Sequence, residues 1–160
     1  MQVMLDLETL GVSPGCAIVA IGAVRFDREQ VTDEFYYRPE WGGRLDHNTV
    51  RWWMGQSDAA RAELLRDPDG PMERGLTEFM KFLGSSPVWG NGSDFDNVIL
   101  ASCYRRLSIP GWSHRQNRCY RTVRSLLDVP GSPPTIKHHA LEDARAQAVH
   151  LMAILHQLGL

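Results

Sequence analysis

The chain opens on MQVMLDLETL (residues 1–10), where a short apolar run meets two acidic residues. Residues 2–6 predict a buried β-strand. Because residues two apart on a strand point to the same face, Asp6 and Glu8 should present neighbouring carboxylates at the end of this strand. Two carboxylates so close repel each other unless a cation lies between them. A lone Asp-x-Glu is more often a solvated strand end, so this pattern alone assigns no function.

The segments that follow predict a mixed sheet with helices around it. Residues 17–26 and 35–37 are apolar and predict two strands that form an antiparallel meander with the first. Residues 87–89 and 118–120 predict two further short strands. Helices are expected at residues 49–54, 59–65, 72–83, 93–107 (with Ser93 as N-cap), 122–127 and 139–158. This order indicates an α/β protein with a mixed five-stranded sheet flanked by helices, forming one domain over residues 1–160.

Composition limits the function classes without choosing among them. The net charge is −2, from 17 basic and 19 acidic residues, which is not the usual balance of a nucleic-acid-binding protein. Bound cations would reverse the sign of an acidic site, so the total neither supports nor excludes a nucleic acid partner. The three cysteines show no close-pair spacing, which favours a reducing cytoplasm over a disulfide framework. The chain shows neither a signal peptide nor a long apolar run, so we expect no membrane association.

Two further groups of polar residues carry candidate chemistry. GNGSDFD (residues 90–96) places Asp94 and Asp96 at an expected helix start, where an acid often only interacts with the helix dipole. HHALEDA (residues 138–144) places a histidine five positions before Asp143, which should lie in the first turn of the last helix. Zinc binding is a competing reading of this segment. It is disfavoured because Cys119 is the only nearby cysteine and the chain has no Cys-x-x-Cys pair.

Taken in order, the three patterns resemble the exonuclease motifs of the DEDDh superfamily. These are Asp-x-Glu on the first strand, Asn-x-x-x-Phe-Asp at a middle helix and His-x-Ala-x-x-Asp at the last helix, spanning residues 6–143. Within this superfamily the chain most resembles small exodeoxyribonuclease VIII-like enzymes, bacterial 3′–5′ exoribonucleases and phage DexA-type enzymes. The segments that carry this resemblance are Trp52-Trp53, FDNVIL (residues 95–100) and RCYRT (residues 118–122). Proofreading subunits commonly carry Asp-Thr-Leu near the last of these segments, so the resemblance to them is weaker.

The resemblance implies a ribonuclease H-like fold and a 3′–5′ exonuclease acting on single-stranded DNA or RNA. Two Mg²⁺ or Mn²⁺ ions would be held by Asp6, Glu8, Asp96 and Asp143 and would clamp the scissile phosphate. His138 would be the general base that takes a proton from the attacking water, and the product would be a nucleoside 5′-monophosphate. The motif register prefers Asp96 to Asp94, because the acid directly follows Phe95. It prefers His138 to His139, because the base precedes Asp143 by five residues.

Substrate contacts implied by the same resemblance are less tied to the motifs. The expected substrate-binding residues are Leu7, Thr9, Trp52, Trp53, Asn91 and Phe95. The two tryptophans could stack on bases, but adjacent helix residues face different ways, so we expect at least one to belong to the core. Six arginines could follow the phosphates or form a solvated face: Arg105, Arg106, Arg115, Arg118, Arg121 and Arg124.

A different functional class stays open beside the enzyme. A catalytically silent domain could bind nucleic acid ends or tether a partner, although retention of all four acids and the histidine speaks against it. Related small exonucleases are often dimers, so the resemblance also allows a homodimer.

Overall fold

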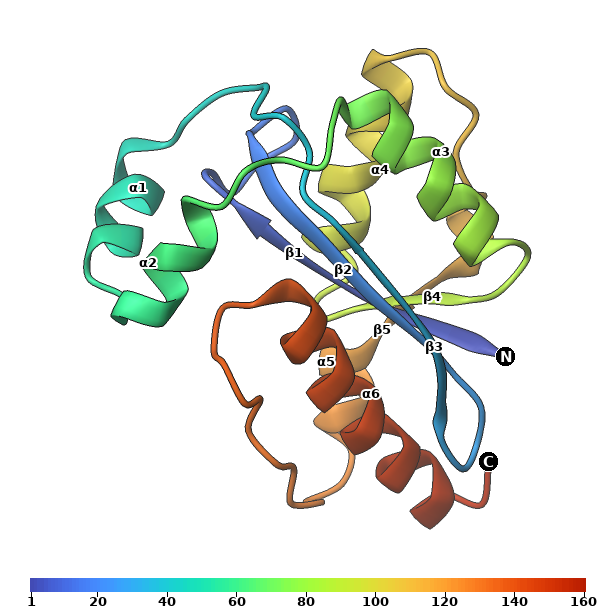
Figure 1. The fold of residues 1–160 in the computed structure, drawn as a ribbon. Coiled ribbons are helices and arrows are strands. Elements are labelled where there is room, and N and C mark those ends of the chain that lie inside the picture. Colours follow the sequence, from blue (N-terminus) through green and yellow to red (C-terminus); the bar gives the residue numbers. More distant parts are fainter.

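The computed structural model describes residues 1–160 and contains a five-stranded sheet in the order β3-β2-β1-β4-β5 (Figure 1). Strands β1 (Gln2–Thr9), β2 (Ile18–Phe26) and β3 (Val31–Tyr37) form an antiparallel meander. The short strands β4 (Val88–Gly90) and β5 (Asn117–Cys119) extend the sheet, β4 parallel to β1 and β5 parallel to β4. The expected mixed sheet and its antiparallel start are therefore confirmed.

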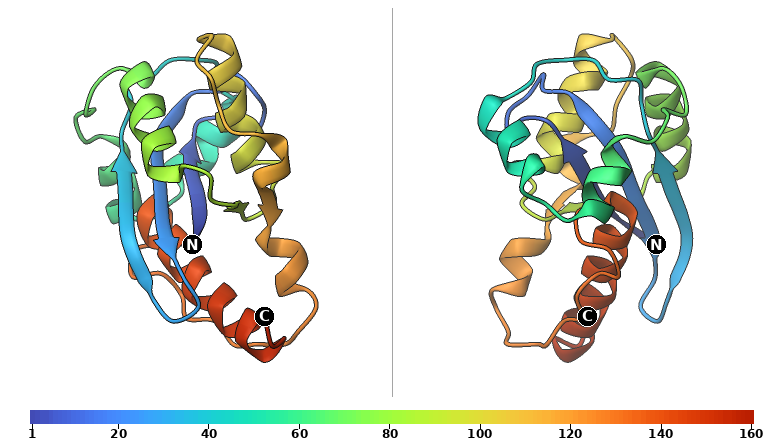
Figure 2. Two further views of the ribbon diagram at one scale, coloured as in Figure 1. Left: turned by 90° about the vertical axis from the view of Figure 1, so that its right-hand side faces the viewer. Right: turned by 60° about the vertical axis from the view of Figure 1, so that its left-hand side comes forward.

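Helices cover both faces of the sheet (Figures 1 and 2). On one face, α6 (Ala140–Gln157) packs across the strands, with α5 (Tyr120–Arg124) beside it. On the other face lie α3 (Met72–Leu83) and α4 (Asp96–Arg106). Helices α1 (His47–Met54) and α2 (Asp58–Leu64) stand beyond the end of the sheet, and a short 3-10 helix (His114–Gln116) precedes β5.

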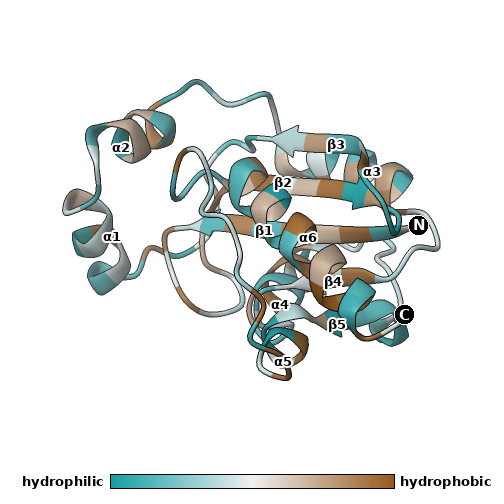
Figure 3. Cartoon of the chain, turned by 90° about the horizontal axis from the view of Figure 1, so that it is seen from below, coloured by the Kyte–Doolittle hydropathy of each residue, from teal (hydrophilic) through white to brown (hydrophobic).

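The alternation along β1 sets the two sides of the sheet. Val3, Leu5 and Leu7 belong to the core beneath α3 and α4, whereas Met4 belongs to the core beneath α6. Figure 3 shows the central strands as largely apolar bands under α6. Since side chains alternate along a strand, the residues that follow Met4 on its face are Asp6 and Glu8. The two acids therefore face the start of α6.

Several element boundaries differ from the sequence expectation. β3 begins at Val31 instead of Phe35, and α1 begins at His47 instead of Thr49. β1 continues past Asp6 to Thr9, because its pairing with β2 continues as far as Ile18. Ser93 is not the N-cap of α4, because residues 93–95 form a turn and the helix begins at Asp96. α5 starts at Tyr120 and ends at Arg124, earlier than expected. All three cysteines are free thiols, and no helix is long and apolar enough to span a membrane.

Candidate active site

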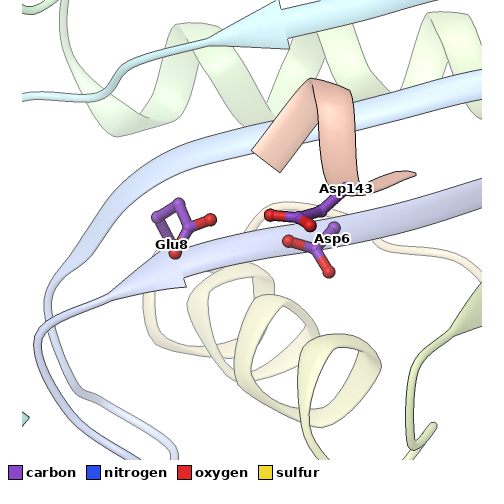
Figure 4. A group of neighbouring side chains, drawn as sticks. All are labelled: Asp6, Glu8 and Asp143. Atoms are coloured by element: carbon purple, nitrogen blue, oxygen red, sulfur yellow. The ribbon is translucent and has the colours of Figure 1, made fainter. Parts of the chain in front are cut away.

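Three of the four motif acids meet between β1 and α6 (Figure 4). Oxygens of Asp6, Glu8 and Asp143 all lie within 4.8 Å of one another. Asp6 and Glu8 come from β1, and Asp143 comes from the first turn of α6, as expected. This arrangement needs close contact between the helix and the sheet.

Gly22 in β2 makes that contact sterically feasible. It pairs with Asp6 across the β1–β2 ladder. A Cβ atom built at this position would lie 2.2 Å from the carbonyl carbon of Ala140, the first residue of α6. Any larger residue would therefore push the start of α6, and Asp143 with it, away from Asp6.

The fourth acid arrives from the opposite side of the sheet. The β1–β4 ladder ends at Leu5 and Gly90, so the N–H of Leu7 has no partner on β4. Asp96 is the first residue of α4, and its Oδ1 accepts a hydrogen bond from this N–H at 3.2 Å. Because residues 93–95 form a turn, α4 begins only at Asp96. Asp96, which is 3% exposed, therefore lies where the pairing of β1 with β4 ends.

A single cavity of about 690 Å³ joins these groups. It is lined by all five residues that sequence analysis assigned to catalysis: Asp6, Glu8, Asp96, Asp143 and His138. Four of the six expected substrate-binding residues also line it, namely Leu7, Trp52, Asn91 and Phe95. Asp94, the weaker candidate of the second motif, lines the same cavity as an exposed residue.

The acids are buried together without a compensating ion pair, and their pKa values rise. Burial, followed by the charges of Asp96, Glu8 and Asp143, raises the pKa of Asp6 well above its usual range. Burial and the charges of Asp143 and Asp96 raise the pKa of Glu8 to about 8. Burial raises the pKa of Asp96 to about 7 against the hydrogen bond from Leu7, and burial also raises the pKa of Asp143. The cavity thus favours protons or cations.

The two adjacent histidines occupy different environments. His138 lies in the loop before α6 with a φ of 62°. Its ring forms a T-shaped contact with the ring of Trp52, with 4.8 Å between the ring centroids. His139 is the N-cap residue of α6 and stacks on Tyr36 at 4.8 Å. Only His138 lines the cavity. His139 was expected in the cap region or on the surface. It is the cap residue, but its side chain is only 14% exposed, because Tyr36 and Glu63 enclose it.

The tryptophan pair divides between cavity and core. Trp52 is 47% exposed and lines both the acidic cavity and a neighbouring cavity of about 600 Å³. Trp53 is 3% exposed, and its Nε1 donates to the carbonyl oxygen of Thr9 at 2.9 Å. Trp53 also reaches the neighbouring cavity, as do Leu7, Thr9 and Phe95. The hydroxyl of Thr9 donates to the carbonyl oxygen of Gly11 at 2.7 Å, so it is engaged within the protein.

Gln147 was not predicted as a site residue from the sequence, and Arg121 was predicted only as one of six arginines. The amide Nε2 of Gln147 donates to Oδ1 of Asp6 at 2.9 Å. Gln147 follows Asp143 by four residues, and helix residues at that spacing share a face. This spacing was the available signal. Arg121 lines the acidic cavity from α5, and nothing in its local sequence separates it from the other arginines.

Known proteins share this fold. The structure of Exonuclease X in complex with 5′ overhanging duplex DNA matches 100% of this chain and 94% of its own, with a TM-score of 0.58 and 19% identity. The nuclease domain of 3′hExo, a DEDDh family member bound to rAMP, matches 98% and 92% with a TM-score of 0.57 and 15% identity. At these identities the likeness shows the ribonuclease H-like exonuclease fold.

No curated protein matches the chain at a significant level. A family model does match, over residues 1–155, and it describes a 3′–5′ exoribonuclease Rv2179c-like domain. The match covers nearly the whole chain and all three motifs. The chain therefore belongs to the 3′–5′ exoribonuclease Rv2179c-like domain family and is a 3′–5′ exonuclease.

Proposed function

We propose that this exonuclease uses two divalent ions to remove nucleoside 5′-monophosphates from the 3′ end of a single strand. The observation that carries the proposal is the convergence of the four motif acids and His138 in one cavity. The acids come from three separate elements, so their meeting is a property of the fold and not of local sequence.

The donor set fits hard divalent cations. Asp6, Glu8, Asp96 and Asp143 offer carboxylate oxygens, which Mg²⁺ and Mn²⁺ prefer, and no thiolate lines the cavity. Burial raises the pKa values of Asp6, Glu8 and Asp96, and none of these acids forms an ion pair with a basic residue, so added cations would favour their ionised forms. When bound, the two ions would supply Lewis acidity and neutralise charge on the scissile phosphate. DEDDh exonucleases generally use divalent ions, which agrees with this acidic cluster.

Residues of the chain would position the strand and move the proton. The neighbouring cavity is lined by Leu7, Val12, Trp52 and Phe95, which suits the terminal nucleoside, since a base stacks on aromatic rings regardless of its sequence. His138 would accept a proton from the attacking water at a ring nitrogen, a task for which an imidazole is suited. The water oxygen bonds to phosphorus, and the bond from phosphorus to the 3′-oxygen of the preceding nucleotide breaks. This 3′-oxygen takes up a proton from solvent and becomes the new 3′-hydroxyl end of the strand. The 5′-monophosphate then leaves.

RNA is the substrate we propose over DNA. The family description names exoribonucleases. Among the similar structures, one holds rAMP, another holds duplex DNA, and a 3′-exonuclease structure is described as recognising a histone mRNA stem-loop. These descriptions support a nucleic acid end as the ligand class, and the family description favours RNA within that class.

Matched RNA and DNA oligomers, each labelled once at the 5′ end and once at the 3′ end, test the proposal. With Mg²⁺ or Mn²⁺ we expect immediate release of the 3′ label as a mononucleotide and a ladder of shortened 5′-labelled strands, faster on RNA. Asp143→Asn should be inactive on both. Early release of the 5′ label would overturn the polarity, and full activity after chelation would overturn the two-metal mechanism. A silent end-binding domain would retard the strand in a gel without shortening it.

We further propose that residues 1–160 form one exonuclease domain that acts in the cytoplasm. The family model spans residues 1–155, in agreement with one domain. A homodimer stays a prediction, and sedimentation of the purified protein would decide between one copy and two.

A further inference from the structure

Three cavities adjoin one another along the active-site side of the molecule. The acidic cavity shares Leu7, Trp52 and Phe95 with the apolar cavity of about 600 Å³. It shares Asn91, Asp143 and Gln147 with a third cavity of about 460 Å³, which lies between α5, α6 and the loop at residues 128–134. Because the acidic cavity lies between the other two, a strand bound at the acids can extend into both.

The two outer cavities have different chemistry. The apolar cavity offers Trp52 and Phe95, whereas the third cavity offers Arg124 and the side chain of Asn91. Its inner wall is fixed, since the OH of Tyr120 donates to Nδ1 of His150, whose Nε2 donates to the carbonyl oxygen of Val129, each at 2.7 Å. A terminal base fits the aromatic side, and the sugar-phosphate chain that continues from the scissile phosphate fits the polar side.

Two arginines of α5 mark the path through the polar side. Arg121 lines the acidic cavity, and Arg124 lines the third cavity. They are three residues apart, so their side chains leave the same face of the helix about 5–6 Å from each other. The eight ion pairs of the molecule include neither guanidinium. Both therefore retain positive charge for an anionic ligand.

The position of Arg121 is fixed by the protein. Its Nη2 donates to the carbonyl oxygen of Asn91 at 2.9 Å. Its guanidinium also packs over Gly92, where an added Cβ would lie 3.2 Å from Cζ, and where φ is +102°. A guanidinium has five N–H donors, so this single bond leaves donors for a phosphate. Asp128 also lines the third cavity, where its carboxylate opposes an anion, so the phosphates should lie on the side of the two arginines.

We propose that the third cavity is the subsite for the strand on the 5′ side of the scissile phosphate. Arg121 binds the phosphate of the second linkage from the 3′ end, and Arg124 binds that of the third. The assignment rests on the proposed function, because it needs the scissile phosphate at the four acids and the terminal base on the aromatic side.

Methylphosphonate linkages, which remove the charge of one phosphate, test this subsite in single-turnover release of the 3′-terminal nucleotide. With the unmodified protein, one such linkage at the second position should lower kcat/KM about tenfold or more, since a charge-assisted hydrogen bond is lost. Arg121→Ala should lose a similar factor on the unmodified strand and nothing more on the strand modified at the second linkage. Arg124→Ala should show the same pattern at the third linkage.

Controls separate this contact from a purely structural role. Arg28→Ala removes an exposed arginine in the bend between β2 and β3 and should leave every ratio unchanged. The salt dependence of log KM should decrease by about 0.7 for each of the two α5 variants, as for one lost phosphate contact. If the unmodified protein tolerates a neutral second and third linkage while still shortening the normal strand, the subsite is refuted and the proposed function stands. If the losses from variant and modification multiply, Arg121 acts without touching that phosphate.

Discussion

Two buried groups of charged side chains lie next to each other at the start of α6, and they differ in how their charge is balanced. The first is the acidic cluster of Asp6, Glu8, Asp96 and Asp143, which carries only negative charge. The second, the balanced cluster, contains Tyr36, Arg38, Glu63 and His139 and joins β3, α2 and α6. His138 belongs to the first group and His139 to the second.

The carboxylate of Glu63 in the balanced cluster is paired from within the chain. Arg38 is 3% exposed and donates from Nη1 to Oε1 of Glu63 at 2.9 Å. The hydroxyl of Tyr36 donates to the same oxygen at 2.6 Å. Burial alone would raise the pKa of Glu63, but the hydrogen bonds from Tyr36 and Arg66 outweigh it and hold the pKa below its usual value. Glu63 is thus a largely buried carboxylate that is already paired within the protein.

The pKa values of the two clusters shift in opposite directions, which distinguishes acids that are paired within the protein from acids that are not. In the acidic cluster the pKa values rise, while beside it the pKa of Glu63 falls, although burial acts in the same direction in both. The difference is that Glu63 receives hydrogen bonds from Tyr36 and Arg66 and forms an ion pair with Arg38, all within the protein. An arginine lies within ion-pair distance of Glu63, whereas none lies within that distance of the four acids of the acidic cluster. These four acids therefore remain available to cations from solution.

The largest expected effect follows from removing an acid of the acidic cluster. Asp96→Ala should abolish turnover, because Asp96 lies at the splayed end of β1 and β4 among the other acids. Asp94→Ala should keep a substantial fraction of activity, because Asp94 is an exposed residue at the cavity rim. Rates measured side by side at saturating Mn²⁺ decide the matter. The reverse order would mean that the motif register is wrong.

Substitution of the two adjacent histidines tests whether only the acidic cluster takes part in catalysis. His138→Ala should lower kcat by about 10²–10⁴-fold, the usual contribution of a general base, while metal affinity measured by calorimetry persists. His139→Ala should cost less than about tenfold, since its ring stacks on Tyr36 outside the cavity. An inactive His139→Ala beside an active His138→Ala would refute the assignment. If both stayed active, the base would be another group.

Breaking the balanced cluster should affect stability more than chemistry. Arg38→Met removes the buried cation beside Glu63 and leaves the exposed Arg66 as its remaining arginine partner, so the change should cost up to about 3–5 kcal/mol of the free energy of unfolding. Denaturant unfolding measures this loss. The double variant Arg38→Met/Glu63→Met should recover part of it, because an apolar pair leaves no uncompensated charge. A double variant less stable than the single one would show that the charge of Glu63 is not the cause.

The smallest effect concerns the pH dependence of the metal-free protein. The pKa of Glu8 rises from 4.5 to about 8 on folding, so the folded state binds more protons, and this group's contribution to stability falls as pH rises from about 4.5 to 8. Glu8→Gln should remove that slope and be more stable than the unmodified protein at pH 8, by about 1 kcal/mol or more. With Mg²⁺ the order should reverse. Thermal unfolding across this pH range, with and without Mg²⁺, checks both statements.

Most elements of the fold were predictable because their sequences are locally consistent. Apolar periodicity in the sequence predicts the strand before Asp6, the helix at residues 72–83 and the last helix with Asp143 in its first turn. The start of α4 was not predicted correctly. Ser93 is a good N-cap by residue type, but residues 93–95 form a turn, and Asp96 after the turn accepts a hydrogen bond from the N–H of Leu7. Propensity is a weak preference that such tertiary contacts override.

The sequence by itself determined the residue types and spacing of the site, that is, which acids and which histidine occupy the three motifs. Only the tertiary structure decided what surrounds them. Gly22 admits the start of α6, Gln147 reaches Asp6, and Trp53 enters the core while Trp52 faces the cavity. The physical reason is the sequence separation over which each kind of interaction acts. Periodicity and capping act over a few residues, whereas the distance between Asp6 and Asp143 depends on packing between segments far apart in the chain.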